Sequence, residues 1–211
     1  MSAENRLREE MASLGASFFQ RGLTHGSTGN ISAKLDHGWL LTPTGSSLGR
    51  LDPARISKLD ASGKLLSGDP PSKESFLHLA MYQQRASAGA VVHLHSVHSV
   101  AVSVLEEVDA DDVLPPLTAY QMMRIGTLPL VPYYAPGDPA LADAVRGMAG
   151  KHHAMLLANH GPVVAGSNLA AAADAVEELE ATAQLYLLLR GARVRTLTDA
   201  QVADLRRRFP S

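Results

Sequence analysis

The chain has 211 residues, of which 45% are hydrophobic and 19% charged, and its formal net charge is −2. This composition fits one globular domain spanning residues 1–211 and argues against a nucleic-acid or membrane-surface partner that needs a broad basic surface. Cysteine is absent, which excludes disulfides and thiolate metal ligands. The charged first residues lack the apolar core of a signal peptide, and no stretch has the length of a membrane span. We therefore expect a cytoplasmic protein.

The first half of the chain contains signals for two helices and a short strand. Apolar residues recur at helical spacing over residues 6–21, and Gly22 stands where a glycine commonly ends a helix. Residues 39–42 predict a strand. Ser72 has the side chain of a helix N-cap, and the apolar spacing that follows it predicts a second helix.

The second half of the chain predicts alternating strands and helices. The apolar, β-branched run 90–96 indicates a buried strand, and residues 128–132 are extended but bounded by prolines, which is typical of a sheet edge. The remaining predicted elements are a short helix near 97–105, a turn at 136–139, helices at 139–149 and 169–190, and a strand at 154–158 that ends in a turn at 159–162. Because strands and helices mix along the chain, we expect an α/β or α+β fold around a central sheet.

His93 and His95 are the most informative residues of the sequence. They lie two positions apart in the predicted strand 90–96, so both side chains leave the same face of it. Two neutral imidazoles at this spacing suit a catalytic divalent metal site, with zinc as the first expectation. The alternative is two unrelated histidines that are held by hydrogen bonds.

His160 and Glu74 are candidates for the rest of such a site. His160 follows the predicted strand 154–158, at a position where sheet proteins often place functional groups. Glu74 lies in the first turn of the helix that precedes the histidine strand, where it is either a ligand or acid–base group or a carboxylate that only stabilises the helix dipole. For His160 the alternative is a surface histidine. His78, four residues after Glu74, either orients that carboxylate or is a structural histidine.

Two loops rich in glycine and hydroxyl side chains, residues 24–30 and 43–47, can present backbone N–H groups to an anion. Neither loop matches a nucleotide-binding P-loop, and turns commonly have this composition. The candidate side-chain donors to an anion are Asn30, Thr44, Ser46, Ser47, Ser72 and Lys73.

Six motifs occur in order along the chain. They are Gly-Ser-Thr-Gly-Asn-Ile-Ser (26–32), Leu-Thr-Pro-Thr-Gly (41–45), Pro-Ser-Lys-Glu (71–74), Val-Val-His-Leu-His-Ser-Val-His (91–98), Ala-Asn-His-Gly (158–161) and a closing helix with Glu177, Glu178 and Glu180. Together these motifs resemble the class II, metal-dependent sugar-phosphate aldolase and adducin family, and they span nearly the whole chain.

The resemblance implies a fold, a metal site and an assembly. The fold is a three-layer α/β/α domain with a central, mainly antiparallel sheet, and the assembly is a homotetramer with active sites at subunit interfaces. The implied metal ligands are His93, His95, His160 and Glu74, of which Glu74 is also the catalytic residue, and the implied phosphate pocket consists of Asn30, Thr44, Gly45, Ser72 and the position of Lys73. The ion is Zn²⁺ by first expectation, with Mn²⁺ or Fe²⁺ as alternatives.

Within that family the chain looks most like the 3-oxo-tetronate 4-phosphate decarboxylases, over residues 42–53, 114–120, 128–138 and 156–163. This resemblance implies a small phosphorylated sugar-acid substrate, which is converted to dihydroxyacetone phosphate and CO₂ through a metal-stabilised enediolate. Two departures from the aldolases agree with it. Lys73 stands where fuculose-phosphate aldolases carry a second serine, and no tyrosine follows Tyr186, whereas those aldolases use a tyrosine near the C-terminus.

Three alternatives stay open on the sequence alone. The first is a class II sugar-phosphate aldolase, similar to fuculose-phosphate aldolase, or a 4-epimerase. The second is a non-catalytic module of the adducin type, although such modules lack the histidine ligands present here. The third is an aldolase or dehydratase that acts on a related carbonyl acid without a phosphate. Tyr120 and Arg124 are further candidates for contact with the substrate carboxylate, with packing or a surface ion pair as the alternative for each.

Overall fold

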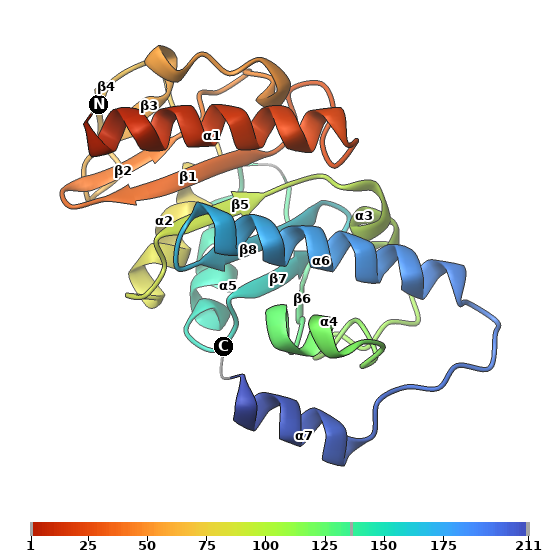
Figure 1. Ribbon diagram of the computed structural model, residues 1–211. Helices are drawn as coiled ribbons and strands as arrows, with labels where there is room; N and C mark the ends of the chain where they lie inside the picture. Colours follow the sequence, from red (N-terminus) through yellow and green to blue (C-terminus); the bar gives the residue numbers. More distant parts are fainter. Residues whose placement is uncertain (1, 136, 210–211) are drawn as a thin grey trace.

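An eight-stranded sheet forms the centre of the protein (Figure 1). The computed structural model describes residues 2–135 and 137–209. The strands are β1 (Asn30–Leu35), β2 (Gly38–Leu41), β3 (Ser57–Leu59), β4 (Leu65–Ser67), β5 (Ala90–His93), β6 (Leu130–Val131), β7 (Ala154–Leu157) and β8 (Gly161–Gly166), in the spatial order β4-β3-β2-β1-β5-β8-β7-β6. Neighbouring strands are antiparallel, except that β6 and β7 are parallel. The expected mainly antiparallel central sheet is confirmed.

Helices cover both faces of this sheet (Figure 1). They are α1 (Ala3–Gln20), α2 (Ser75–Gln84), α3 (Val97–Ser103), α4 (Ala119–Arg124), α5 (Pro139–Ala149), α6 (Leu169–Leu188) and α7 (Asp199–Arg208), with 3₁₀ turns at Leu48–Arg50 and Pro53–Arg55. Helices α2 and α5 pack together on one face, whereas α1, α3 and α6 lie on the other. The three-layer α/β/α architecture is therefore confirmed.

The two apolar layers follow from the alternation of side chains along the central strands. On β5, Val91 packs in the layer of α2 and α5, whereas Val92 packs in the layer of α1, α3 and α6. On β8, Val163 and Val164 divide between the layers in the same way. His93 lies two residues after Val91, so the alternation directs its side chain toward the face that α2 covers.

Several predicted elements are confirmed, with boundaries that differ by a few residues. The helix predicted over residues 6–21 begins earlier, because the hydroxyl of Ser2 accepts a hydrogen bond from the backbone N–H of Asn5 and caps α1. Gly22 follows the end of α1 with a φ of 77°. At the start of α6, the side chain of Asn168 is the N-cap that accepts from the N–H of Ala171.

Three expectations were wrong. Helix α2 begins at Ser75 with Glu74 as its N-cap residue, and the hydroxyl of Ser72 instead accepts a hydrogen bond from the N–H of Glu74 at 3.2 Å. The strand predicted over 90–96 ends at His93. Residues 161–162, expected in a turn, begin β8, where Pro162 needs no N–H because it stands close to the strand end. Strands β1, β3 and β4 and helices α4 and α7 form in segments without a predicted element, and residue 136 of the predicted turn lies outside the described residues.

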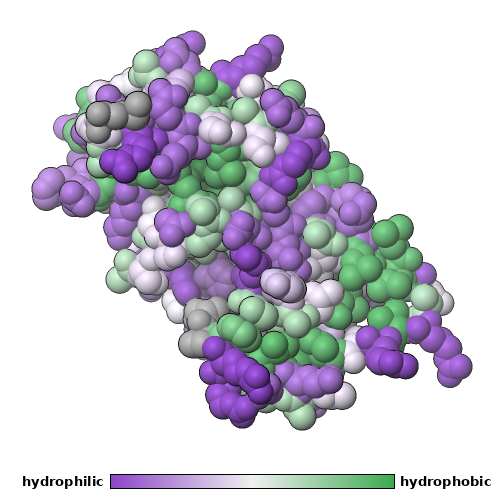
Figure 2. All heavy atoms as spheres, viewed as in Figure 1, coloured by the Kyte–Doolittle hydropathy of each residue, from purple (hydrophilic) through white to green (hydrophobic). Residues whose placement is uncertain are grey.

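Hydrophobic side chains gather at the C-terminal end of α6 on the face drawn in Figure 2. Leu188, in the last turn of that helix, is 74% exposed. Hydrophilic side chains cover much of the rest of this face. Of the helices in the described part of the chain, none combines the length and the apolar character needed to cross a membrane.

Candidate metal centre and active site

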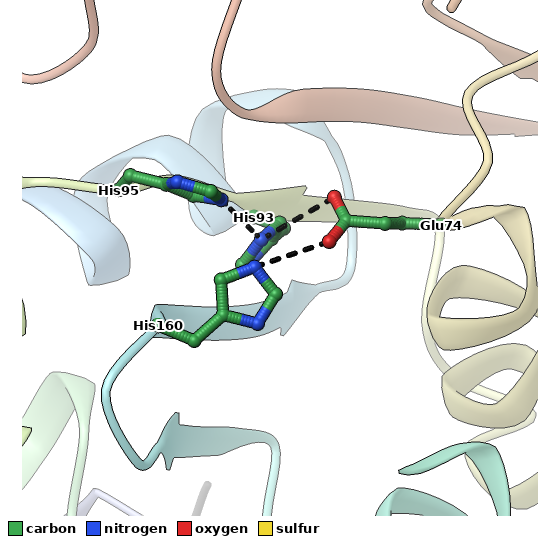
Figure 3. A group of neighbouring side chains, drawn as sticks. All are labelled: Glu74, His93, His95 and His160. Atoms are coloured by element: carbon green, nitrogen blue, oxygen red, sulfur yellow. Dashed lines mark hydrogen bonds and ion pairs between the residues drawn. The ribbon is translucent and has the colours of Figure 1, made fainter. Parts of the chain in front are cut away.

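His93 is the most deeply placed residue of the candidate site. It ends β5 and is fully buried. Its Nδ1 donates a hydrogen bond to the carbonyl oxygen of Pro162 at 2.8 Å, across the pairing of β5 with β8. With the proton on Nδ1, the lone pair of Nε2 is directed at the other candidate ligands (Figure 3). Burial lowers the pKa of His93 below its ordinary value, which favours the neutral imidazole that binds metals.

His95 and His160 approach His93 from the ends of two neighbouring strands (Figure 3). His95 follows β5, and its Nε2 lies 3.1 Å from the Nε2 of His93. Burial lowers the pKa of His95 to about 3, so it is also neutral at physiological pH. His160 lies between β7 and β8, directly after Asn159, whose φ of 56° is uncommon for a residue other than glycine. This left-handed residue turns the chain so that His160 faces the other two imidazoles.

Glu74 completes the cluster from the helix layer that covers this face of the sheet. It precedes α2, and its side chain points toward the three histidines (Figure 3). Its Oε1 lies 3.1 Å from the Nε2 of His160 and its Oε2 lies 3.5 Å from the Nε2 of His93. The side-chain amide of Asn30 donates to Oε2 at 2.7 Å. Burial raises the pKa of the carboxyl, but the adjacent imidazoles and the Asn30 amide lower that pKa by more, so Glu74 is ionised well below neutral pH.

The four side chains fit a divalent metal ion. Their donor atoms all lie within 4.8 Å of one another. Three imidazole nitrogens and a carboxylate oxygen suit zinc and other divalent transition metals. The lone pair of His93 Nε2 faces an ionised oxygen of Glu74, and two such acceptors repel each other unless a cation lies between them. The predicted ligands are thus brought together by the fold, and their chemistry calls for a cation at their centre.

The cluster opens into a cleft of about 600 Å³. Besides Glu74, His95 and His160, the cleft is lined by His25, Val97, Val100, Tyr133, Tyr134 and Asn159. The two tyrosines were not among the predicted site residues, and the only sequence signal for them is an aromatic pair directly after the proline-bounded edge strand. Arg124 forms an ion pair with Asp174 at 2.6 Å, which was the alternative expected for it, and like Tyr120 it does not line this cleft.

The residues expected to hold a phosphate lie in two adjoining loops and, for Asn30, at the start of β1 beside Glu74. A β-bridge between Pro43 and Pro71 joins these loops, and the N–H of Thr44 donates to the carbonyl of Pro70 at 2.9 Å. The hydroxyl of Ser72 accepts from the Asn30 amide at 3.3 Å. Gly45 adopts a φ of 69°, and Lys73 is exposed. Of the other two candidate donors, Ser46 donates to the carbonyl of Pro43 at 2.6 Å, and the buried Oγ of Ser47 has no hydrogen-bond partner within the described residues.

Known proteins resemble this chain over nearly its whole length. A 3-oxo-tetronate 4-phosphate decarboxylase from Pectobacterium atrosepticum is 52% identical over 206 residues, which are 97% of this chain and 94% of that protein. An L-fuculose phosphate aldolase from Escherichia coli K12 is 33% identical over 97% of this chain and 94% of its own length. The crystal structure of YgbL from Escherichia coli superposes with a TM-score of 0.96, at 50% identity, over 97% of this chain and all of that one.

The family of class II aldolase and adducin N-terminal domains matches residues 9–187. These residues include the Asn30 end of β1, both loops beside Glu74, and all four candidate ligands. The chain therefore belongs to the class II aldolase and adducin N-terminal domain family.

Proposed function

We propose that this protein is a carboxy-lyase that needs a divalent metal and converts 3-oxo-tetronate 4-phosphate to dihydroxyacetone phosphate and CO₂. The observation that carries the proposal is the cluster of Glu74, His93, His95 and His160 at an open cleft. It occurs in a chain that is 52% identical to a named decarboxylase over nearly its full length, whereas the aldolase relative is 33% identical.

Glu74, His93, His95 and His160 would hold the ion, with Zn²⁺ as the first expectation and Mn²⁺ or Fe²⁺ as alternatives. When bound, a divalent ion supplies a Lewis acid that stabilises negative charge on the oxygens of a β-keto acid. The hydrogen bond from His93 Nδ1 to Pro162 fixes the ring orientation before the ion arrives.

Glu74 is proposed to manage the proton of the reaction. Breaking the bond between C1 and C2 releases CO₂ and leaves its electron pair on the remaining fragment, and C2 must then gain one proton to give dihydroxyacetone phosphate. Glu74 is the one carboxylate among the described residues that line the cleft. Glu74 would relay this proton from solvent to C2 and end the turnover ionised, as it began, so that each turnover consumes one proton from solution.

The loops beside Glu74 are proposed to hold the phosphate of the substrate. Thr44, Gly45, Ser72 and the ammonium of Lys73 lie on the two loops that the Pro43–Pro71 bridge joins, and Asn30 adjoins Ser72. Binding at this remote end fixes the orientation of the reacting carbons. The apolar wall that includes Val97 and Val100 would surround the departing carboxylate with few water molecules, which favours loss of its charge.

We further propose that the whole chain acts as one domain in a cytoplasmic homotetramer. The side chains of Val97 and Tyr133, at the cleft, are 59% and 62% exposed, and so is most of Leu188 at the end of α6. Contact between subunits would remove this apolar surface from water. Light scattering after gel filtration should give a mass of four times the 22.4 kDa chain, and the mass of a single chain would contradict the assembly.

The test is an incubation of metal-loaded protein with enzymatically generated 3-oxo-tetronate 4-phosphate, in which CO₂ and dihydroxyacetone phosphate are followed together. We expect both products in equal amounts, and no product after chelation of the metal or from His93→Ala. If CO₂ is not released, the assignment fails. A panel of sugar phosphates assayed for aldehyde release would then test the second candidate, an aldolase or 4-epimerase, which the 33% identical relative favours.

A further inference from the structure

Behind Glu74, buried polar side chains of β1 and α2 form a continuous hydrogen-bonded chain. The oxygen of the Asn30 amide lies 2.5 Å from Nε2 of His78, whose Nδ1 lies 2.7 Å from the hydroxyl oxygen of Ser32. That oxygen lies 2.7 Å from the hydroxyl of Tyr82. His78 and Tyr82 are four residues apart on one face of α2, and Glu74 precedes His78 by the same interval at the N-cap of that helix. Asn30 and Ser32 are two residues apart on one face of β1. The helical period of α2 and the alternation along β1 therefore bring the side chains of the two elements into contact.

The direction of each hydrogen bond in this chain follows from Glu74. A carboxylate can only accept, so the NH₂ group of Asn30 must face it and the amide oxygen must face His78. Nε2 of His78 then donates, and because burial lowers the pKa of His78 to about 3, its Nδ1 carries a lone pair. The hydroxyl of Ser32 donates to that lone pair, which leaves the Tyr82 hydroxyl to donate to Ser32.

The side chains of this hydrogen-bonded chain are buried, and burial favours a single set of hydrogen-bond directions. Asn30 is 3% exposed, and Ser32 and His78 are fully buried. The ring of Trp39 stacks on His78 and meets Tyr82 edge to face. Reversing any one bond would place two donors or two acceptors together away from water, which is costly. The Asn30 amide, whose orientation follows from Glu74, is therefore held in place from behind by residues that do not line the cleft.

We propose that His78, Ser32 and Tyr82 are positioning residues that act through Asn30 to aim the Glu74 carboxylate at the three histidines. This inference rests on the proposed role of Glu74 as a metal ligand and proton carrier. Fixing the amide holds one carboxylate oxygen, Oε2, at 2.7 Å and leaves Oε1 directed at His160. Such outer partners of metal ligands tune metal affinity and activity by about 10-fold to 100-fold.

The experiment compares two buried serines in neighbouring parts of the same sheet. Ser32→Ala removes the middle link of the chain. Ser57→Ala is the matched control, because Ser57 is also fully buried in a strand and its hydroxyl donates to the carbonyl of Asp69 at 2.7 Å, outside the chain. Each full-length variant is titrated with Zn²⁺ in competition with a chromogenic chelator, and its melting temperature is recorded.

Both serine variants are expected to melt at lower temperature, but only Ser32→Ala should bind Zn²⁺ more weakly, by about 10-fold. Its kcat should fall by a similar factor, because the carboxylate of Glu74 is then aimed less well at the three histidines. If Ser32→Ala does not fold, Tyr82→Phe takes its place in the test. This variant removes only the last donor, so it should lower the Zn²⁺ affinity and kcat in the same direction but by less.

Equal Zn²⁺ affinity of wild type, Ser57→Ala and the folded variants of the chain would overturn the inference, since the chain would then only join α2 to β1. The Zn²⁺ titration uses no substrate, so a wild-type protein that binds Zn²⁺ but releases no CO₂ would refute the proposed reaction and leave the comparison of the serines valid.

Discussion

Replacement of Gly161 by alanine is the sharpest test of how the backbone sets the spacing of the ligands. Gly161 follows His160, and a Cβ atom added to it would lie 2.2 Å from the carbonyl oxygen of Leu94, the residue between His93 and His95. Real Cβ atoms essentially never come closer than 3.0 Å to a neighbour, and 3.4 Å is ordinary contact. The two backbone segments must therefore separate by about 1 Å. Metal sites tolerate deviations of about 0.2 Å in ligand distance, so we expect Zn²⁺ affinity and turnover each to fall by about 100-fold.

The assay is again a Zn²⁺ titration against a chelator, followed by kcat on the metal-saturated protein. Gly147→Ala is the control, because this glycine lies inside α5 and an added Cβ meets no atom within 4 Å. Removing a helix glycine there should stabilise the protein by about 0.5–1 kcal/mol without changing the affinity. If Gly161→Ala folds and binds Zn²⁺ as tightly as Gly147→Ala, close approach of the backbone does not determine the ligand spacing.

Three further predictions concern the cluster and its surroundings. Glu74→Gln should weaken Zn²⁺ binding at least as much as Ser32→Ala does, because it removes a charged candidate ligand, and it should lower the turnover of the Zn²⁺-saturated protein by about 100-fold or more. Near-normal turnover would exclude Glu74 as the proton carrier. Saturation with Zn²⁺ at about 100 times its Kd should raise the free energy of unfolding by about 2.7 kcal/mol, a gain that His93→Ala should abolish in thermal melts. In the metal-free protein, the unfolded chain protonates His78 near the ordinary histidine pKa of 6.5, whereas burial lowers the pKa of His78 in the folded protein to about 3. The unfolded state thus binds more protons between these values, so His78 alone should lower the free energy of unfolding by up to about 1.4 kcal/mol per pH unit as pH drops below about 6.5. Urea titrations at several pH values should show that the free energy of unfolding of His78→Gln depends less steeply on pH.

The sequence indicated which side chains meet in the cluster because the spacing of the two strand histidines reflects local geometry. The separation of His93 and His95 by two residues indicated a shared direction, and their Nε2 atoms are 3.1 Å apart even though β5 ends at His93. Helical periodicity likewise identified α1 and α6, because apolar residues at that spacing share one face of a helix, and that face packs against the core. The N-cap of α2 was misjudged because Ser72 lies two residues before Glu74, and its hydroxyl accepts from the N–H of Glu74 and from the Asn30 amide rather than from the first turn of α2.

The features that the sequence did not reveal depend on pairing between distant segments. Gly161 and Pro162 have the composition of a turn, yet they begin a central strand between β5 and β7. Pro162 contributes an acceptor rather than a donor, because its carbonyl oxygen accepts from the N–H of Leu94 and from Nδ1 of His93. Sequence rules for strands consider that proline lacks an N–H donor. The acceptor role of its carbonyl oxygen depends on β5, which is distant in the sequence.

The residues that line the cleft, rather than the candidate metal ligands, distinguish decarboxylation from aldol cleavage. Both reactions break a carbon–carbon bond next to a carbonyl and leave the same enediolate, so the cluster serves either. Aldol cleavage must also remove a proton from a substrate hydroxyl, which needs a second base. Loss of CO₂ needs no such base, and a carboxylate sheds its charge more readily beside apolar side chains. In the described lining of the cleft, Val97 and Val100 provide this apolar contact and match loss of CO₂, whereas His25, Tyr133 and Tyr134 are the side chains that could act as the second base of an aldol cleavage.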